Sequence, residues 1–155
     1  MSFFALYIKL KMISKIPFTF IKIEDRGFHL LINVLINNKN ANLLIDTGAS
    51  KTVFDLNRIQ PFLNNSDLTD NEMLSAGLGT NTLTSKSTKL ESFKIGEFEI
   101  NNYPCIIIDM NHINETYQSI GLEPFDGVLG SDILYKFKAA IDFKTKTLKL
   151  RKKNK

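Results

Sequence analysis

One short stretch, residues 42–50 (Asn-Leu-Leu-Ile-Asp-Thr-Gly-Ala-Ser), combines residue types that can do chemistry. An apolar run, typical of a short buried strand, ends at Asp46, and a hydroxyl, a glycine and two small side chains follow. Asp46 offers a carboxylate, and Thr47 offers a hydroxyl that can fix the loop from behind. Gly48 lets the backbone N–H approach the carboxylate, and Ala49 keeps the space above it open. A lone Asp after a strand is usually a turn or cap residue. The full five-residue motif at 46–50, and not Asp46 alone, therefore indicates an active-site loop.

The word Asp-Thr-Gly-Ala-Ser after an apolar triplet resembles the active-site loop of aspartic proteases, in particular the single-domain retropepsins. Peptide hydrolysis by this route needs two carboxylates that share a proton. The chain has no second Asp-Thr-Gly or Asp-Ser-Gly. Either the protein is catalytically inactive, or a second copy of the chain supplies the second carboxylate. The resemblance implies an aspartic endopeptidase in which Asp46 from each subunit of a homodimer forms the catalytic pair. It implies a peptide or protein substrate and no cofactor or metal.

A second telling stretch is residues 125–134 (Phe-Asp-Gly-Val-Leu-Gly-Ser-Asp-Ile-Leu). Alone, it predicts a strand-to-helix turn. Beside the first motif, Val128, Leu129 and Gly130 resemble the hydrophobic-hydrophobic-Gly motif of retropepsins, in which the strand passes behind the Asp loop. Gly130 would then permit close approach of two backbones. Many viral members have Arg where this chain has Ser131, so their Arg-centred network is expected to be absent or replaced, and Asp132 is expected to be structural.

A glycine-containing segment lies between the two motifs. Its Gly-Leu-Gly is not a phosphate loop, because no P-loop Lys follows and no full G-x-G-x-x-G is present. The segment instead predicts a mobile hairpin tip between residues 72–76 and 83–93. The resemblance makes this hairpin the flap that closes over a bound peptide, although the tip lacks an aromatic residue. The flap residues expected to bind substrate are Ala76, Gly77, Leu78 and Gly79.

Alternating hydrophobicity predicts the elements that carry these motifs. Residues 18–23 and 28–37 are expected to be strands, and in the second, every other residue from Phe28 to Ile36 shares one face. Asn-Asn-Lys-Asn at 37–40 predicts a turn, so a β-hairpin delivers the Asp46 loop. Further predicted strands are 52–54, 83–98, 98–100, 104–110, 139–143 and 147–151. A helical turn capped by Asp55 is expected at 55–62, a short helix or loop at 111–120, and a short helix after Gly130.

The resemblance covers roughly residues 18–150 and is closest to bacterial retropepsin-like proteins. It implies an all-β fold, a single-lobe retropepsin-like closed β-barrel with a flap hairpin and a short C-terminal helix. The 155 residues suit one globular domain, with an N-terminal extension at 1–16, the protease domain at 17–151 and a basic tail at 152–155. A catalytically inactive peptide-binding or dimerisation module with the same fold is the alternative.

Composition excludes several other classes of function. The net charge of +4 is concentrated at the C-terminus, so binding to nucleic acid is not expected. The single cysteine, Cys105, allows no intrachain disulfide, which fits a reducing compartment such as the cytoplasm. Cys105 is expected in the core. His29 and His112 lie far apart in the sequence, without the spacing of metal ligands. His29 is expected on a strand face, and His112 is expected to face solvent.

The apolar run at residues 1–10 raises the question of targeting. It has no positive region before it and no small-x-small cleavage site after it, so a signal peptide is not expected. It is also shorter than the roughly 20 residues of a transmembrane helix. Met12 is an alternative start, and a membrane-tethered protease that uses this run as an anchor stays open.

Overall fold

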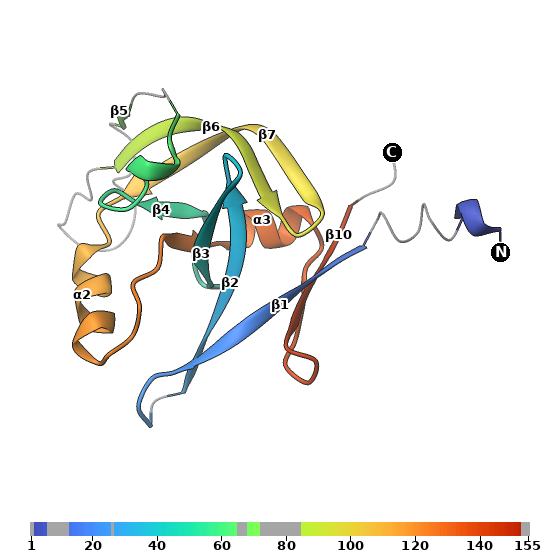
Figure 1. Cartoon of the computed structure of the whole chain (residues 1–155), viewed down its shortest axis with the longest axis horizontal. Coiled ribbons are helices and arrows are strands. Elements are labelled where there is room, and N and C mark those ends of the chain that lie inside the picture. Colours follow the sequence, from blue (N-terminus) through green and yellow to red (C-terminus); the bar gives the residue numbers. More distant parts are fainter. Residues whose placement is uncertain (1, 6–12, 26, 65–67, 72–84, 153–155) are drawn as a thin grey trace.

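Three consecutive antiparallel strands carry the first part of the chain. The computed structural model describes residues 2–5, 13–25, 27–64, 68–71 and 85–152. Strands β1 (Ile13–Lys22), β2 (Phe28–Ile36) and β3 (Lys39–Ile45) follow one another through tight turns (Figure 1). Because β3 ends at Ile45, the β2–β3 hairpin delivers Asp46 at the end of a strand, as the sequence predicts.

The alternation on β2 sorts its side chains between core and surface. One face is buried and contributes Leu30, Ile32, Val34 and Ile36 to the core. Phe28 shares this face in the sequence pattern, but it is 60% exposed because it is the first residue of β2 and lies at the edge of the core. His29 on the other face is exposed, as expected for a strand-face residue.

Six strands close into a barrel. The strands that follow β3 are β4 (Val53–Asp55), β5 (Thr69–Asn71), β6 (Ser85–Ile95), β7 (Phe98–Ile108) and β8 (Gly127–Leu129). The ring runs β2, β3, β8, β4, β7, β6, and β6 pairs back with β2 at Ile36 and Phe93. The all-β, single-lobe closed barrel predicted from the sequence is therefore confirmed. The prediction of two strands at 98–100 and 104–110 is wrong, because β7 continues through Asn102, which takes a positive φ of 52°.

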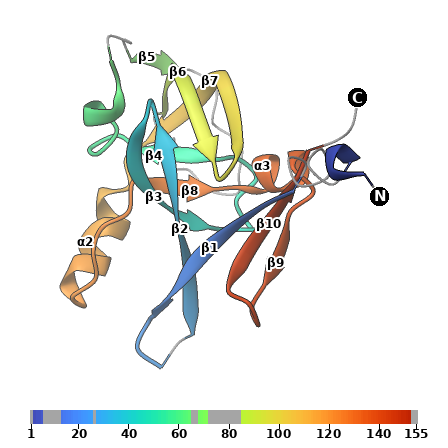
Figure 2. The same ribbon diagram turned by 45° about the vertical axis from the view of Figure 1, so that its right-hand side comes forward.

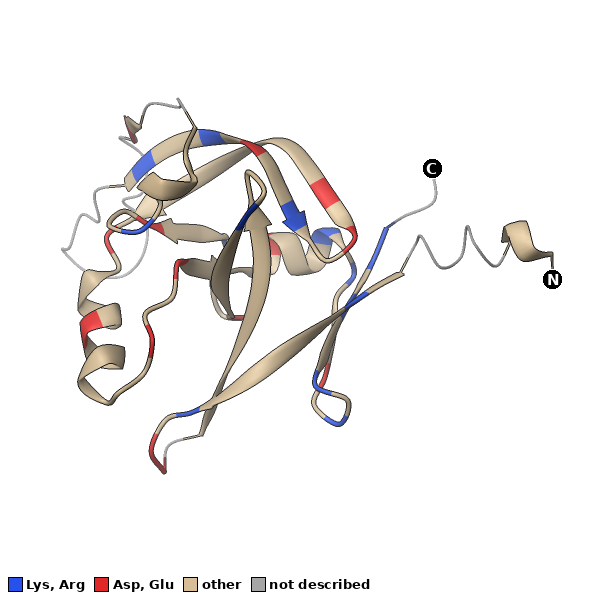
Figure 3. Cartoon of the chain, viewed as in Figure 1, with Lys and Arg blue, Asp and Glu red and all other residues tan. Residues whose placement is uncertain are grey.

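Short helices connect and close the strands. They are the 3₁₀ helix η1 (Gln60–Phe62), α2 (Asn111–Ser119) and α3 (Ser131–Lys136), and α3 is the predicted short C-terminal helix. The strands β9 (Ala140–Asp142) and β10 (Thr147–Arg151) form the expected terminal hairpin beside β1 (Figure 2). Basic side chains gather on this C-terminal part of the chain (Figure 3).

Strand β1 begins within the segment that the sequence assigns to an N-terminal extension. Residues 13–17 of β1 pair with β10, and the Ile16 side chain is 5% exposed. The Ser14 hydroxyl accepts a hydrogen bond from the Glu97 N–H at 2.9 Å, which joins β1 to the β6–β7 turn. Residues 13–16 therefore belong to the sheet, and their pairing partner lies more than a hundred residues away. The division into an extension at 1–16, a protease domain at 17–151 and a basic tail at 152–155 stays a prediction.

The buried residues form two clusters. The larger fills the barrel and includes Phe54, Phe93 and Leu129, all with no exposed surface. The smaller lies under α2 and is built from Leu44, Met110, Tyr117 and Phe125. The second cluster matters for the site, because Leu44 and its partner Val128 also line the cleft described below.

Candidate active site

The loop after β3 presents the Asp46 carboxylate at the surface. The Asp46 N–H donates to the Leu129 carbonyl at 3.0 Å, which fixes the start of the loop. The Gly48 N–H donates to Asp46 Oδ1 at 2.8 Å, so the loop holds its own carboxylate. Asp46, Thr47 and Gly48 are exposed, and Ala49 is half-buried. The loop therefore offers an oriented carboxylate that a ligand can reach.

Strand β8 passes directly behind this loop. It pairs in parallel with β3, with Val128 opposite Leu44 and Leu129 opposite Ile45. At Gly130, an added Cβ would lie 2.5 Å from the carbonyl carbon and oxygen of Lys51, so only glycine fits between the two segments. The structure thus places the two sequence motifs, residues 46–50 and 128–130, against each other.

Hydrogen bonds among Thr52, Gly130 and Asp132 stabilise the place where β8 crosses behind the Asp46 loop. Asp132 Oδ1 accepts hydrogen bonds from the Thr52 N–H at 2.9 Å and from the Thr52 hydroxyl at 2.8 Å. The same hydroxyl oxygen accepts a hydrogen bond from the Gly130 N–H at 3.0 Å. Burial and the charge of Asp132 raise the pKa of the nearby Tyr103 phenol. Thr52 and Asp132 therefore connect the segment after the Asp46 loop to α3.

Sequence reasoning did not single out Thr52. It expected a strand to begin there, and the residue is 99% buried just before β4. The only sequence signal is a hydroxyl residue within an otherwise apolar strand start. Its partner Asp132 is 80 residues away, so the contact depends on the closed barrel.

A cleft of about 410 Å³ opens beside Asp46. Its polar and titratable lining is Asp46, Thr47 and His29. Its apolar lining comes from β2, β3, β8 and the β9–β10 hairpin, and consists of Phe28, Leu30, Leu44, Ile45, Val128, Ile141 and Phe143. Within the described residues, Asp46 is the only carboxylate that lines this cleft.

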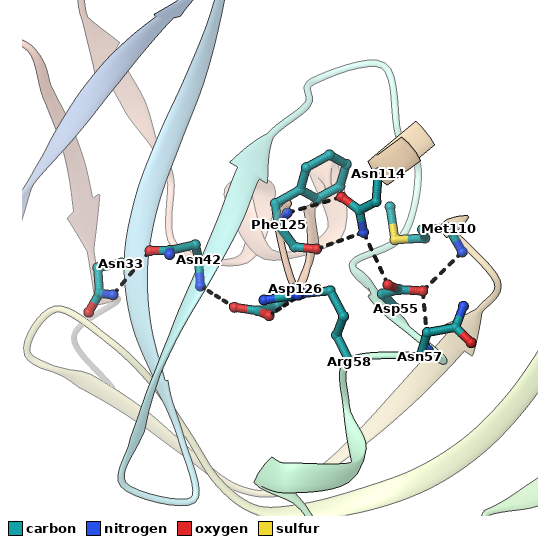
Figure 4. A network of polar contacts seen from close by, with 9 residues as sticks. All are labelled: Asn33, Asn42, Asp55, Asn57, Arg58, Met110, Asn114, Phe125 and Asp126. Carbon is teal, nitrogen blue, oxygen red and sulfur yellow. Dashed lines mark hydrogen bonds and ion pairs between the residues drawn. The ribbon is translucent and has the colours of Figure 1, made fainter. Parts of the chain in front are cut away.

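The two acidic residues of the stretch 125–134, Asp126 and Asp132, serve the fold. Asp126 is 95% buried, and its carboxylate accepts hydrogen bonds from the Asn42 N–H and from Arg58 Nε, each at 2.8 Å (Figure 4). Asp132 is held by Thr52 as described above. Neither residue lines the cleft, so neither is placed to complete a carboxylate pair with Asp46 in the same chain.

Helix α2 is anchored by a buried amide beside the second motif. The Asn114 side chain donates to Asp55 and to the Phe125 carbonyl, each at 3.1 Å, and accepts from the Phe125 N–H at 3.0 Å (Figure 4). Asp55, expected to cap a helical turn, is 99% buried, and it also accepts from the Met110 N–H at 3.0 Å. These bonds fix α2 over the sheet face next to the cleft.

A second hollow, of about 590 Å³, lies on the other side of Thr47. It is lined by Thr47, Ser131, Leu134, Tyr135, Lys136, Lys138 and Ala139. Three of these residues, Leu134, Tyr135 and Ala139, are apolar or aromatic, and the Tyr135 side chain is 88% exposed. Exposed aromatic residues are enriched at contact sites for other proteins.

The predicted flap residues, Ala76, Gly77, Leu78 and Gly79, lie outside the described residues. The flanking strands β5 and β6 pair antiparallel, with Asn71 opposite Ser85, so the chain leaves and re-enters the sheet at adjacent positions. The flap assignment stays a prediction.

Other chemistries find little support in the described part of the chain. No group of three or more His, Cys, Asp or Glu side chains there is arranged to hold a metal ion. Cys105 is buried in β7, and burial raises the pKa of its thiol to about 12, which disfavours the reactive thiolate. Among the same residues, no helix has the length and apolar character needed to cross a membrane.

Comparisons with known proteins agree with this geometry. A family model described as aspartyl protease matches residues 32–133, which include both motifs. The comparison with curated proteins found no match. Among solved structures, the EIAV protease in complex with the inhibitor HBY-793 is similar, with a TM-score of 0.55 and 20% identity, over 79% of this chain and 100% of that one.

Two cellular proteins are similar to about the same degree. A retropepsin-like aspartic protease from Rickettsia conorii has a TM-score of 0.52 and 20% identity, over 90% of this chain and 91% of that one. The retroviral protease-like domain of Ddi1 from Leishmania major has a TM-score of 0.51 and 15% identity, over 79% and 87%. The family model and the shared barrel together show that the chain belongs to the aspartyl protease family and has the retropepsin-like fold.

Proposed function

We propose that this protein is a homodimeric aspartic endopeptidase whose catalytic pair consists of Asp46 from each of two copies. The observation that carries the proposal is the exposed, oriented Asp46 carboxylate, which lines the cleft with no second carboxylate among the described residues. Peptide hydrolysis without a metal needs an acid and a base together. One carboxylate per chain therefore calls for a second chain.

In the pair, the two carboxylates share one proton, because two like charges in contact cannot both ionise without a large cost. The ionised carboxylate takes a proton from a water molecule held between the two side chains. The water attacks the scissile carbonyl, and the protonated carboxyl donates its proton to the carbonyl oxygen. The Gly48 N–H holds Oδ1 of Asp46 in place during these transfers.

The surface next to Asp46 supports pairing of two copies. Thr47, which adjoins Asp46, lines both the cleft and the second hollow, so a partner loop meeting Thr47 would also reach Leu134 and Tyr135. Strand β9 is last in the sheet order, and its outer edge pairs with no other described strand. A two-fold axis between the two Asp46 side chains would bring these same surfaces together as an isologous interface.

The substrate in this proposal is an extended peptide or protein segment. Backbone hydrogen bonds to an extended chain supply affinity, and pockets for alternate side chains supply specificity. The apolar lining contributed by Phe28, Val128 and Phe143 favours peptides with bulky apolar side chains. The predicted flap at Gly77 and Gly79 would cover the bound chain from above.

A cleavage profile of wild type beside Asp46→Asn tests the proposal. Wild type should cut a peptide library at defined positions, and Asp46→Asn should lower kcat/KM by at least about a thousandfold. Asp25→Asn, which removes an exposed carboxylate in the β1–β2 turn, is the matched control and should retain activity. Specific activity should rise with protein concentration, and excess Asp46→Asn should suppress wild type after subunit exchange.

The shared proton also predicts a bell-shaped pH profile with its maximum below neutral pH. Activity that rises steadily from acid to alkaline pH would contradict the carboxylate pair. Full activity of a dilute monomer would contradict the two-chain site. Peptide binding without any cleavage would instead identify the protein as an inactive binding module with this fold.

A further inference from the structure

The cleft beside Asp46 contains one imidazole. Of the described residues that line it, only Asp46, Thr47 and His29 have polar side chains, and His29 is the only one with an N–H donor. His29 comes from β2, where Ile21 of β1 is its cross-strand partner. A polar ligand group that enters this cleft away from Asp46 therefore meets apolar side chains or the His29 ring.

Helix α2 holds the His29 ring in place. The Tyr117 hydroxyl forms a hydrogen bond with His29 Nδ1, and the two ring centroids are 5.8 Å apart. Tyr117 is 95% buried, and its ring packs edge-on against Phe125 at 5.1 Å. Burial raises the pKa of the Tyr117 phenol, so its hydroxyl keeps its proton.

This contact decides which nitrogen of His29 carries the proton. Within the described part of the chain, His29 Nδ1 is the only hydrogen-bond partner of the Tyr117 hydroxyl. A buried hydroxyl needs an acceptor, so we assign Tyr117 as the donor to Nδ1 of the neutral ring, which leaves the ring proton on Nε2. His29 is thereby left with an oriented Nε2–H donor in a cleft that is otherwise mostly apolar.

We propose that His29 is a specificity-determining residue that donates a hydrogen bond from Nε2 to a side-chain carboxylate or carboxamide oxygen of the bound peptide. The inference rests on the proposed function and names a feature of its substrates. A peptide with an apolar side chain here leaves the imidazole donor unpaired, whereas Gln or Glu satisfies it. Sites that hydrogen-bond a substrate group discriminate strongly against analogues that lack the group.

The test uses a cleaved peptide in which each position in turn is Gln, Glu or Met, three side chains of similar length. Wild type should prefer Gln or Glu over Met at one position by about tenfold, mainly through KM. His29→Phe should remove this preference and still cleave the Met peptide, while His29→Gln, which keeps a donor, should retain part of it. Tyr117→Phe frees the ring and should weaken the preference. His112→Phe, on the exposed face of α2, is the matched control.

The two acceptors are separated by comparing Gln with Glu. A preference for Glu over Gln indicates a carboxylate acceptor, and a preference for Gln over Glu indicates a carboxamide acceptor. The same peptides are also measured for binding to Asp46→Asn protein by calorimetry. If wild type cleaves nothing but binding shows the His29-dependent preference, the proposed function fails and this inference stands. A preference that survives His29→Phe, or none in either assay, overturns the inference.

Discussion

At the scale of single residues, Thr52 and Asp132 determine how firmly the Asp46 loop is held. Asp132→Ala leaves the Thr52 N–H and hydroxyl without their acceptor, and a buried unpaired group costs about 1–3 kcal/mol. We expect a loss in the free energy of unfolding on the order of 3 kcal/mol, measured by urea denaturation. Asp132→Asn keeps an Oδ1 acceptor and should cost roughly 1 kcal/mol. Equal losses for the two variants would show that the Thr52 contacts contribute little.

The same residues show what a motif can and cannot predict. The close crossing at Gly130 was implied by the resemblance to retropepsins and not by the glycine alone, and the structure has that crossing. Thr52 does not follow, because a hydroxyl residue before a strand is common and its partner is supplied only by tertiary contact. Ser131, at the position where many viral members have Arg, predicted only that their Arg-centred network is absent or replaced.

At the scale of elements, the β9–β10 hairpin beside the cleft is stabilised by hydrogen bonds to the Asp142 carboxylate, whose strength depends on pH. Asp142 accepts hydrogen bonds from the Thr145 N–H at 3.1 Å and from Lys149 Nζ at 3.0 Å. The Thr145 N–H and Lys149 lower the pKa of the Asp142 carboxyl to about 2, from an ordinary value of 3.8. The folded pKa is depressed, so the stabilisation is fully present above pH 3.8 and is lost as pH falls towards 2.

This contact predicts an acid-sensitive hairpin. The Thr145 amide signal should titrate with a midpoint near pH 2 by NMR, and the β9–β10 pairing should loosen only below pH 3.8. At the acid pH where the proposed protease works, the hairpin that presents Ile141 and Phe143 to the cleft should stay formed. Asp142→Asn should remove the titration. A midpoint at 3.8 would mean that the hairpin contacts do not favour the ionised carboxylate.

At the scale of the whole molecule, the proposed dimer places Tyr135 in its interface. Replacing a buried interface aromatic residue typically costs about 2 kcal/mol of binding, roughly 30-fold in dissociation constant. Tyr135→Ser should therefore shift the monomer–dimer equilibrium by about that factor in sedimentation, and activity on dilution should fall in parallel. The monomer fold should be unaffected, because Tyr135 is 88% exposed in the single chain.

A matched control is available on another face. Ile113 of α2 is 45% exposed and lines neither the cleft nor the second hollow, so Ile113→Ser should leave the dissociation constant unchanged. If Tyr135→Ser and Ile113→Ser behave alike, the second hollow is not the dimer interface.

The sequence alone determined the features that depend on local order. Alternating apolar residues predicted β2, and the apolar run at 43–45 predicted the end of β3. The turn between them and the Asp-Thr-Gly-Ala-Ser loop were also recognisable, because each of these features is specified by neighbours in the chain. The C-terminal helix and hairpin followed from the same kind of local pattern.

Only the tertiary structure decided the contacts between distant residues. The tertiary fold brings Asp132 to Thr52, Arg151 to Ile13, and Tyr117 to His29, each across at least 80 positions of the chain. Periodicity in a single strand says which face a side chain takes but not which distant segment meets that face. The lining of the cleft, and the orientation of the one imidazole in it, are therefore consequences of packing.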